Sequence, residues 1–183
     1  MSQFNSCYIG VAFYNISTFP TQWALVLSEN PHFIGPGWGS TATDTVDGRV
    51  SVSWLWFERS PTGFNTRGQF WGVVRIGQVP MSINNLKLMI SNSNRASVED
   101  RAHVPGTDDI SWGTDKYVVL ALLRLYEERR LKLPRLGRAS LLHFIGGRIR
   151  DLLRVRYVPG GVVYPVVALD SGNVSFGHSR YSG

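Results

Sequence analysis

The stretch Cys7-Tyr-Ile-Gly-Val-Ala-Phe-Tyr14 sets the fold class of this chain, because it is short, apolar and rich in β-branched and aromatic residues. A second such run, Gln22-Trp-Ala-Leu-Val-Leu-Ser28, follows a connector that Pro20 interrupts. Residues 49–57 and 70–77 have the same character, and apolar and small polar side chains alternate along the first of them. These four runs predict paired strands of a sheet.

Helical periodicity begins after Pro80, where apolar residues recur three and four positions apart. Residues 83–92 predict a short helix, and a longer one opens at Thr114, which is suited to be its N-cap. A third helix is expected over residues 139–156, with Gly146-Gly147 weakening its middle. The expected apolar stripe of this third helix comprises Leu142, Ile145, Ile149, Leu152 and Leu153.

Two further segments contain proline. Residues 35–39, Gly-Pro-Gly-Trp-Gly, predict a turn, and Pro165 limits the apolar run of residues 162–167 to an edge strand or an extended arm. The elements together predict an α+β fold, an antiparallel sheet with two to three helices, in one domain of residues 1–183. An exposed edge strand can pair with a second copy, so a homo-oligomer is one expected state.

The composition is that of a folded chain, with 43% hydrophobic and 17% charged residues among 183. Its longest apolar runs, such as Val118 to Leu123, are much shorter than the roughly 20 residues that span a bilayer. The N-terminus shows no secretory signal pattern, which predicts a cytoplasmic protein. The single cysteine, Cys7, excludes an internal disulfide, and no histidine has a metal-ligand spacing. We therefore expect neither a metal nor a cofactor.

Positive charge is concentrated in residues 124–156, which hold ten cationic and three acidic side chains, whereas the whole chain carries +6. Nine of the ten cations are arginines, whose planar guanidinium suits phosphate and carboxylate. A solvated face or a subunit contact is the more common role of such a cluster, and nucleic acid or an anionic surface is the alternative partner. The candidate basic patch comprises Arg129, Arg130, Arg148, Arg150 and Arg154.

The order of the motifs Tyr8-Ile-Gly-Val-Ala-Phe-Tyr14, Gln22-Trp-Ala-Leu, His32-Phe-Ile-Gly and the helix start Gly113-Thr114 resembles an uncharacterised fungal family. Members of that family carry a His-Trp-Ala-Leu-like strand, a short His-containing strand and an Asn-Cys-x-x-Trp-Val helix start. That layout is similar to permuted papain-like enzymes of the lecithin-retinol acyltransferase type. The resemblance implies a papain-like core over residues 8–130, followed by a basic helix and a C-terminal arm over residues 131–183.

In such enzymes a strand histidine activates a cysteine at a helix N-terminus, and a second polar residue orients the histidine. Carried onto this chain, the resemblance places the histidine position at Gln22, the orienting position at His32 and the cysteine position at Thr114. Two of the three chemical roles are therefore lost. Plain structural roles also fit these residues: a polar strand end, a loop histidine and a helix N-cap. Residues that would line the implied cleft are Trp38, Trp112, Asp115 and Tyr117.

Three functions remain open from the sequence. The first is a non-catalytic protein whose degenerate papain-like cleft binds a small molecule, a peptide or a partner chain. The second is an enzyme that acts on a small acyl, amide or apolar substrate, with His32 as acid or base beside Thr114 or Asp115. The third is binding of nucleic acid or an anionic surface through the arginine-rich helices.

Overall fold

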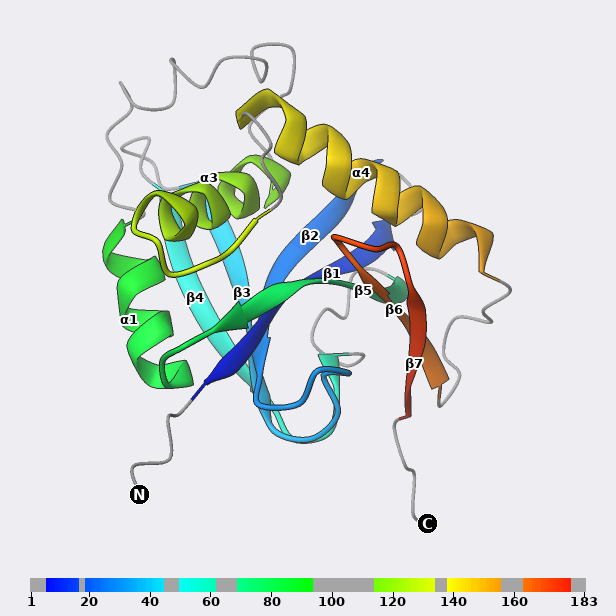
Figure 1. Cartoon of the computed structure of the whole chain (residues 1–183), viewed down its shortest axis with the longest axis horizontal. Coiled ribbons are helices and arrows are strands. Elements are labelled where there is room, and N and C mark those ends of the chain that lie inside the picture. The colour runs from blue at the N-terminus through cyan, green and yellow to red at the C-terminus, as the bar shows by residue number, and fades with distance from the viewer. Residues whose placement is uncertain are drawn as a thin grey trace.

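The computed structural model describes residues 6–16, 19–44, 50–61, 69–93, 114–133, 138–155 and 163–178. Within these residues, seven strands form one sheet and three helices pack against it, which confirms the predicted α+β class (Figure 1). The strands are β1 (Cys7–Ile16), β2 (Phe19–Ser28), β3 (Gly37–Asp44), β4 (Val50–Phe57), β5 (Gln69–Val79), β6 (Val163–Ala168) and β7 (Val174–His178). The helices are α1 (Ile83–Ser93), α3 (Thr114–Glu127) and α4 (Arg138–Arg154).

The strand order in the sheet is β4-β3-β2-β1-β5-β6-β7. Neighbouring strands are antiparallel except β5 and β6, which run parallel. A parallel pair needs a crossover connection, and the chain between β5 and β6 carries all three described helices. The sheet is therefore mixed, which corrects the prediction of an antiparallel sheet.

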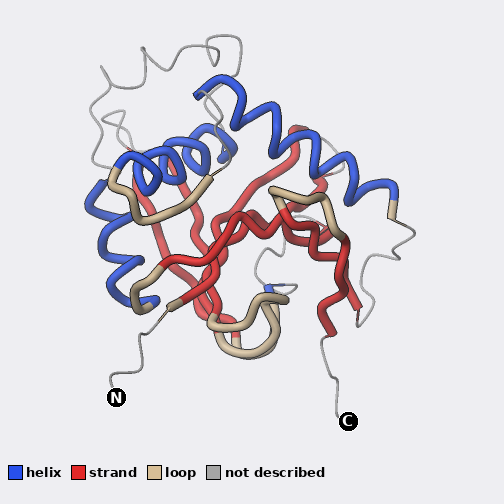
Figure 2. The backbone as a smooth tube through the Cα atoms, in the orientation of Figure 1, coloured by secondary structure: helices blue, strands red, loops and turns tan. Residues whose placement is uncertain are grey.

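Alternate residues of each strand point to opposite faces of the sheet. On β1, Val11 and Phe13 pack with the apolar stripes of the helices, whereas Ala12 and Tyr14 pack in a separate cluster on the other side. Figure 2 shows the helices in blue gathered on one side of the red sheet. We call this side the helix face and the other the opposite face.

The opposite face is closed by the segment between β2 and β3, which turns back over the strands. Phe33 in this segment is completely buried and adopts a φ of 58°. Its ring fits over Gly10, where an added Cβ would lie 2.6 Å from Phe33 Cζ. The Tyr164 hydroxyl lies 2.9 Å from the Phe33 carbonyl oxygen and donates a hydrogen bond to it, which ties the segment to β6.

Two segments differ from their prediction. Residues 37–39, expected in a turn, form the start of β3, because the glycines there allow close packing: a Cβ on Gly37 would overlap the Phe57 ring and the Leu27 carbonyl. β6 is an interior strand between β5 and β7, not an edge strand or an arm. Pro165 is accommodated because its neighbour Gly72 lacks a Cβ, which would lie 2.6 Å from the Pro165 carbonyl oxygen. The sequence reasoning missed β7 altogether.

The predicted helices all form, within a few residues of their expected limits. α3 packs over β2 and β3, and α4 packs over β5 and β6. Three members of the predicted stripe of α4 are buried together with Leu141, which was not predicted; the Leu142 and Leu153 side chains lie outside the described set. The buried residues of this stripe are Leu141, Ile145, Ile149 and Leu152.

Candidate functional site

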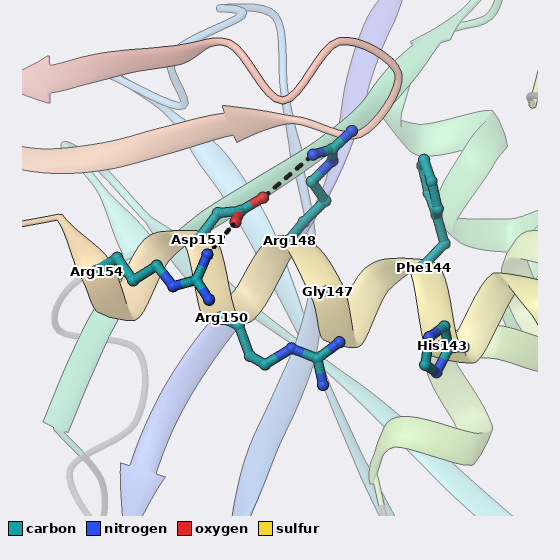
Figure 3. Close-up of a pocket in the computed structure, with 7 residues that line it drawn as sticks. All are labelled: His143, Phe144, Gly147, Arg148, Arg150, Asp151 and Arg154. Carbon is teal, nitrogen blue, oxygen red and sulfur yellow. Dashed lines mark hydrogen bonds and ion pairs between the residues drawn. The ribbon is translucent and has the colours of Figure 1, made fainter.

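A shallow hollow lies on the outer surface of α4, away from its buried stripe. Its volume is about 320 Å³, and α4 alone supplies its lining (Figure 3). We call this feature the α4 hollow. Its lining residues are His143, Phe144, Gly147, Arg148, Arg150, Asp151 and Arg154.

Gly147, which has no side chain, lies at the centre of the α4 hollow. On a helix surface the neighbours of a residue stand three and four positions away in each direction. For Gly147 these neighbours are His143, Phe144, Arg150 and Asp151, and all four line the hollow. Figure 3 shows Phe144 and Arg148 pointing to one side of the helix and His143 and Arg150 to the other, with Gly147 between them. The floor of the hollow is therefore helix backbone.

Arg148 is held in place by contacts on several sides. Its Nε donates to the Leu169 carbonyl oxygen at 3.0 Å, and its Nη1 donates to Asp151 Oδ2 at 3.1 Å. The guanidinium carbon lies 5.0 Å from the centroid of the Phe144 ring, within the range of a cation–π contact. The turn between β6 and β7 covers the group, since a Cβ on Gly172 would lie 2.5 Å from Arg148 Nη1. We call this set of contacts the Arg148 latch.

The other two arginines of the hollow are freer. Arg154 Nη1 lies 3.8 Å from Asp151 Oδ1, and the Arg154 side chain is 80% exposed. Arg150 is exposed and forms no ion pair with any described residue. Asp151 is thus shared between Arg148 and Arg154, and the lining holds three arginines but one carboxylate. The hollow keeps an excess of positive charge that a bound anion can offset.

The predicted basic patch does not form one surface. Arg148, Arg150 and Arg154 line the α4 hollow, but Arg129 and Arg130 do not. The latter two are exposed and follow the end of α3, which in Figure 1 lies above α1, far from the end of α4. Sequence reasoning treated all five arginines as one cluster because they are close along the chain.

Gln22 lies on β2, whereas His32 lies in the segment after β2 and contacts Ser175 of β7. Gln22 is near the start of the strand, paired with Tyr14, and His32 follows the strand end at Ser28. β7 is the fourth strand from β2 in the sheet, and at a strand spacing of about 4.8 Å the two strands are roughly 19 Å apart. The structure therefore does not bring Gln22 and His32 together, as the implied cleft requires. The side chains of Gln22, Thr114 and Asp115 and the whole of Trp112 lie outside the described residues.

His32 faces β7 instead. Its Nδ1 lies 3.2 Å from Ser175 Oγ, and that hydroxyl lies 3.3 Å from the Val166 carbonyl oxygen. The Val166 carbonyl can only accept, so the Ser175 hydroxyl donates to it. Val166 belongs to the cluster of the opposite face, whereas α3 packs on the helix face. The sheet thus separates His32 from the helix that begins at Thr114.

Tyr117 and Trp38, two of the predicted ligand-binding residues, contact other residues of the fold. Tyr117 is 4% exposed and packs in the core of the helix face, so it does not line the α4 hollow. Trp38 lies on β3, not in a turn-rich segment. Its ring contacts the Trp56 ring edge-on at a centroid distance of 5.1 Å, and Lys87 Nζ lies 3.0 Å from its centroid. The Trp38 ring is therefore already in contact with Trp56 and Lys87.

Cys7 has no nucleophilic character in this fold. It is completely buried, and burial together with the nearby Glu29 carboxylate raises the pKa of its thiol to about 12. A thiol with such a pKa is protonated at neutral pH and reacts slowly.

No protein-family model, curated protein or solved structure matches this chain. The resemblance to papain-like enzymes gains no support from these comparisons. Among the described residues, no helix is long and apolar enough to span a membrane, and no group of three or more His, Cys, Asp or Glu side chains is arranged to hold a metal ion.

Proposed function

We propose that this protein is a non-catalytic binding protein that takes a phosphate-bearing ligand in the α4 hollow. The observation that carries the proposal is the Arg148 latch beside two exposed arginines, Arg150 and Arg154. The proposal moves the ligand-binding role from the implied papain-like cleft, with its expected lining of Trp38, Trp112, Asp115 and Tyr117, to the outer face of α4.

Fixing Arg148 in advance lowers the cost of binding. A free arginine loses side-chain entropy when it closes on a ligand, whereas Arg148 is already ordered by Leu169, Asp151 and Phe144. Its guanidinium has five N–H donors, and the two described hydrogen bonds use two of them. The planar arrangement of the remaining donors matches the oxygen atoms of a phosphate.

The charge and size of the hollow favour phosphate over a lone carboxylate. The three arginines and Asp151 of the lining sum to two positive charges, and a phosphate monoester carries nearly two negative charges at neutral pH. A volume of about 320 Å³ is at the small end of the range for ligand sites. The hollow therefore suits one small phosphate ester, or one unit of a longer chain.

The proposal is tested by calorimetric titration with adenosine 5′-monophosphate as the probe. The double variant Arg150→Gln with Arg154→Gln should weaken binding about tenfold or more, because it removes two cations of the rim but keeps good helix formers. The matched control is Arg129→Gln with Arg130→Gln, which removes the same charge outside the hollow and should change the affinity less than twofold. Equal weakening by both pairs, or no binding by the unaltered protein, would overturn the proposal.

A further inference from the structure

The two glycines in the middle of α4 are unfavourable for a helix. Glycine is the poorest helix former after proline, because it loses the most backbone freedom on folding. Gly146 and Gly147 are consecutive residues at the centre of this helix, which packs against β5 and β6. A helix of this length would gain stability from almost any other residue at these positions.

Packing does not require either glycine. A Cβ on Gly146 would meet no atom within 4 Å, and one on Gly147 would meet only the flexible Arg150 Nη2 at 3.8 Å. Elsewhere in the chain the reason for a glycine is visible: at Gly10 an added Cβ would lie 2.6 Å from the Phe33 ring, and at Gly72 2.6 Å from the Pro165 carbonyl oxygen. The fold itself therefore leaves the glycines of α4 unexplained.

Only Gly147 opens into the α4 hollow; Gly146 does not line it. Any side chain at position 147 would project between His143, Phe144, Arg150 and Asp151 and fill the centre of the hollow. Glycine at this position exposes the flat backbone of the helix to a ligand. This explains why a residue that is unfavourable for the helix stands where the arginines gather.

We infer that the ligand of the α4 hollow is of the nucleotide class, with a flat ring lying on the backbone at Gly147 and the phosphate against the three arginines that follow it, Arg148, Arg150 and Arg154. This inference rests on the proposed function and specifies its ligand. The floor at Gly147 is uncharged, the aromatic rings of His143 and Phe144 come before it along the helix, and the three arginines come after it. A ligand that fits this division has an uncharged planar part joined to a phosphate.

The same chemistry is found in a free nucleotide and in one unit of a single-stranded nucleic acid. A strand would extend past the hollow in both directions, because the hollow is a shallow surface feature of the helix. Its phosphates would add contacts that a free nucleotide lacks, so a strand should bind more tightly and with a steeper dependence on salt. The two sources therefore differ in a quantity that can be measured.

The test uses three probes and two single variants of the full chain. The probes are adenosine 5′-monophosphate, ribose 5-phosphate, which lacks the base, and a fluorescein-labelled ten-nucleotide thymidine strand. Gly147→Ala should weaken binding of the adenosine probe about tenfold, since the methyl group keeps the ring off the backbone, and should change ribose 5-phosphate binding less than twofold. Gly146→Ala is the matched control and should leave both affinities unchanged. Thermal unfolding should show both variants at least as stable as the original protein, which excludes misfolding as the cause.

The outcomes separate this inference from the proposed function. If the glutamine pair at Arg150 and Arg154 weakens binding while Gly147→Ala binds like Gly146→Ala, the arginine site stands and the placement of the ring is wrong. If the unaltered protein binds none of the three probes, both proposals fall. Tighter binding of the thymidine strand than of the adenosine probe identifies a nucleic acid strand as the source, and equal or weaker binding identifies a free nucleotide.

Discussion

Replacing Gly172 with alanine perturbs the turn between β6 and β7 and the Arg148 latch together. Gly172 has a φ of 70°, in the left-handed region that disfavours residues with a Cβ. The added methyl carbon would also lie 2.5 Å from Arg148 Nη1 and 2.9 Å from Arg148 Cζ, closer than such atoms can approach. The guanidinium must therefore move, and its bonds to Leu169 and Asp151 must lengthen or break.

The size of the effect follows from these two contributions. The left-handed backbone costs an alanine about 1 kcal/mol. Loss of a charge-assisted hydrogen bond adds about 1 to 2 kcal/mol, at the lower end here because the Arg148 and Asp151 side chains are 21% and 34% exposed. The sum is a loss of about 2 to 3 kcal/mol, which for a chain of this size lowers Tm by roughly 5 to 10 °C.

The matched control is Gly35→Ala. Gly35 has a similar φ of 86°, but an added Cβ there would meet no atom within 4 Å. This variant should lose only the backbone contribution of about 1 kcal/mol. Differential scanning calorimetry measures both variants, and the difference between them reports the Arg148 latch. If the two variants unfold at the same temperature, the latch contributes nothing to stability and Arg148 is not held in advance as we describe.

Further predictions concern the buried groups. Tyr164→Phe removes a donor to the Phe33 carbonyl oxygen, so the free energy of unfolding measured in urea should fall by about 1 to 2 kcal/mol. An unchanged free energy of unfolding would mean that this hydrogen bond does not hold the segment between β2 and β3. Cys7 should stay unmodified by a thiol reagent near pH 8 in the folded protein and react at once in denaturant, and rapid labelling of the folded protein would contradict its burial. Because its folded pKa of about 12 lies above the ordinary value of 9.0, the unfolded thiol ionises first, so stability should fall as pH rises from 9 toward 12 and Cys7→Ala should reduce that fall.

The strands that sequence reasoning found are those whose alternation is complete over several residues, such as β1 and β2. β3 was missed because Gly37 and Gly39 follow Gly35-Pro36, a composition typical of turns. The reason for Gly37 is the Phe57 ring that occupies the space of its Cβ, and that ring lies far away in the sequence. A local pattern contains no such information.

The residues of the α4 hollow can be recognised in the sequence, but their arrangement on one outer surface cannot. The arginines and the pair Gly146-Gly147 are evident in the sequence, but two glycines in a helical segment predict only a weaker helix. Which face of α4 stays outside depends on its packing over β5 and β6, and β6 comes later in the chain. The signal that could have located the hollow is the position of Gly147 three and four residues from His143, Phe144, Arg150 and Asp151.

The implied papain-like cleft rested on the order of motifs along the chain. Order does not give distance: Gln22 and His32 are ten residues apart in the chain, yet Gln22 lies on β2 and His32 contacts β7, the fourth strand from β2 in the sheet. Nor does it say which face of the sheet a loop will cover, which here is decided by Phe33 packing over Gly10.

The central claim, that the α4 hollow is the ligand site, is tested most directly by mapping backbone amide shifts in NMR spectra during titration with adenosine 5′-monophosphate. We predict that the largest shifts fall in residues 143–154 and in the turn at residues 169–173 that covers Arg148. Shifts centred on Gln22, His32 and the start of α3, or on Arg129 and Arg130, would contradict the claim and return the site to one of those places.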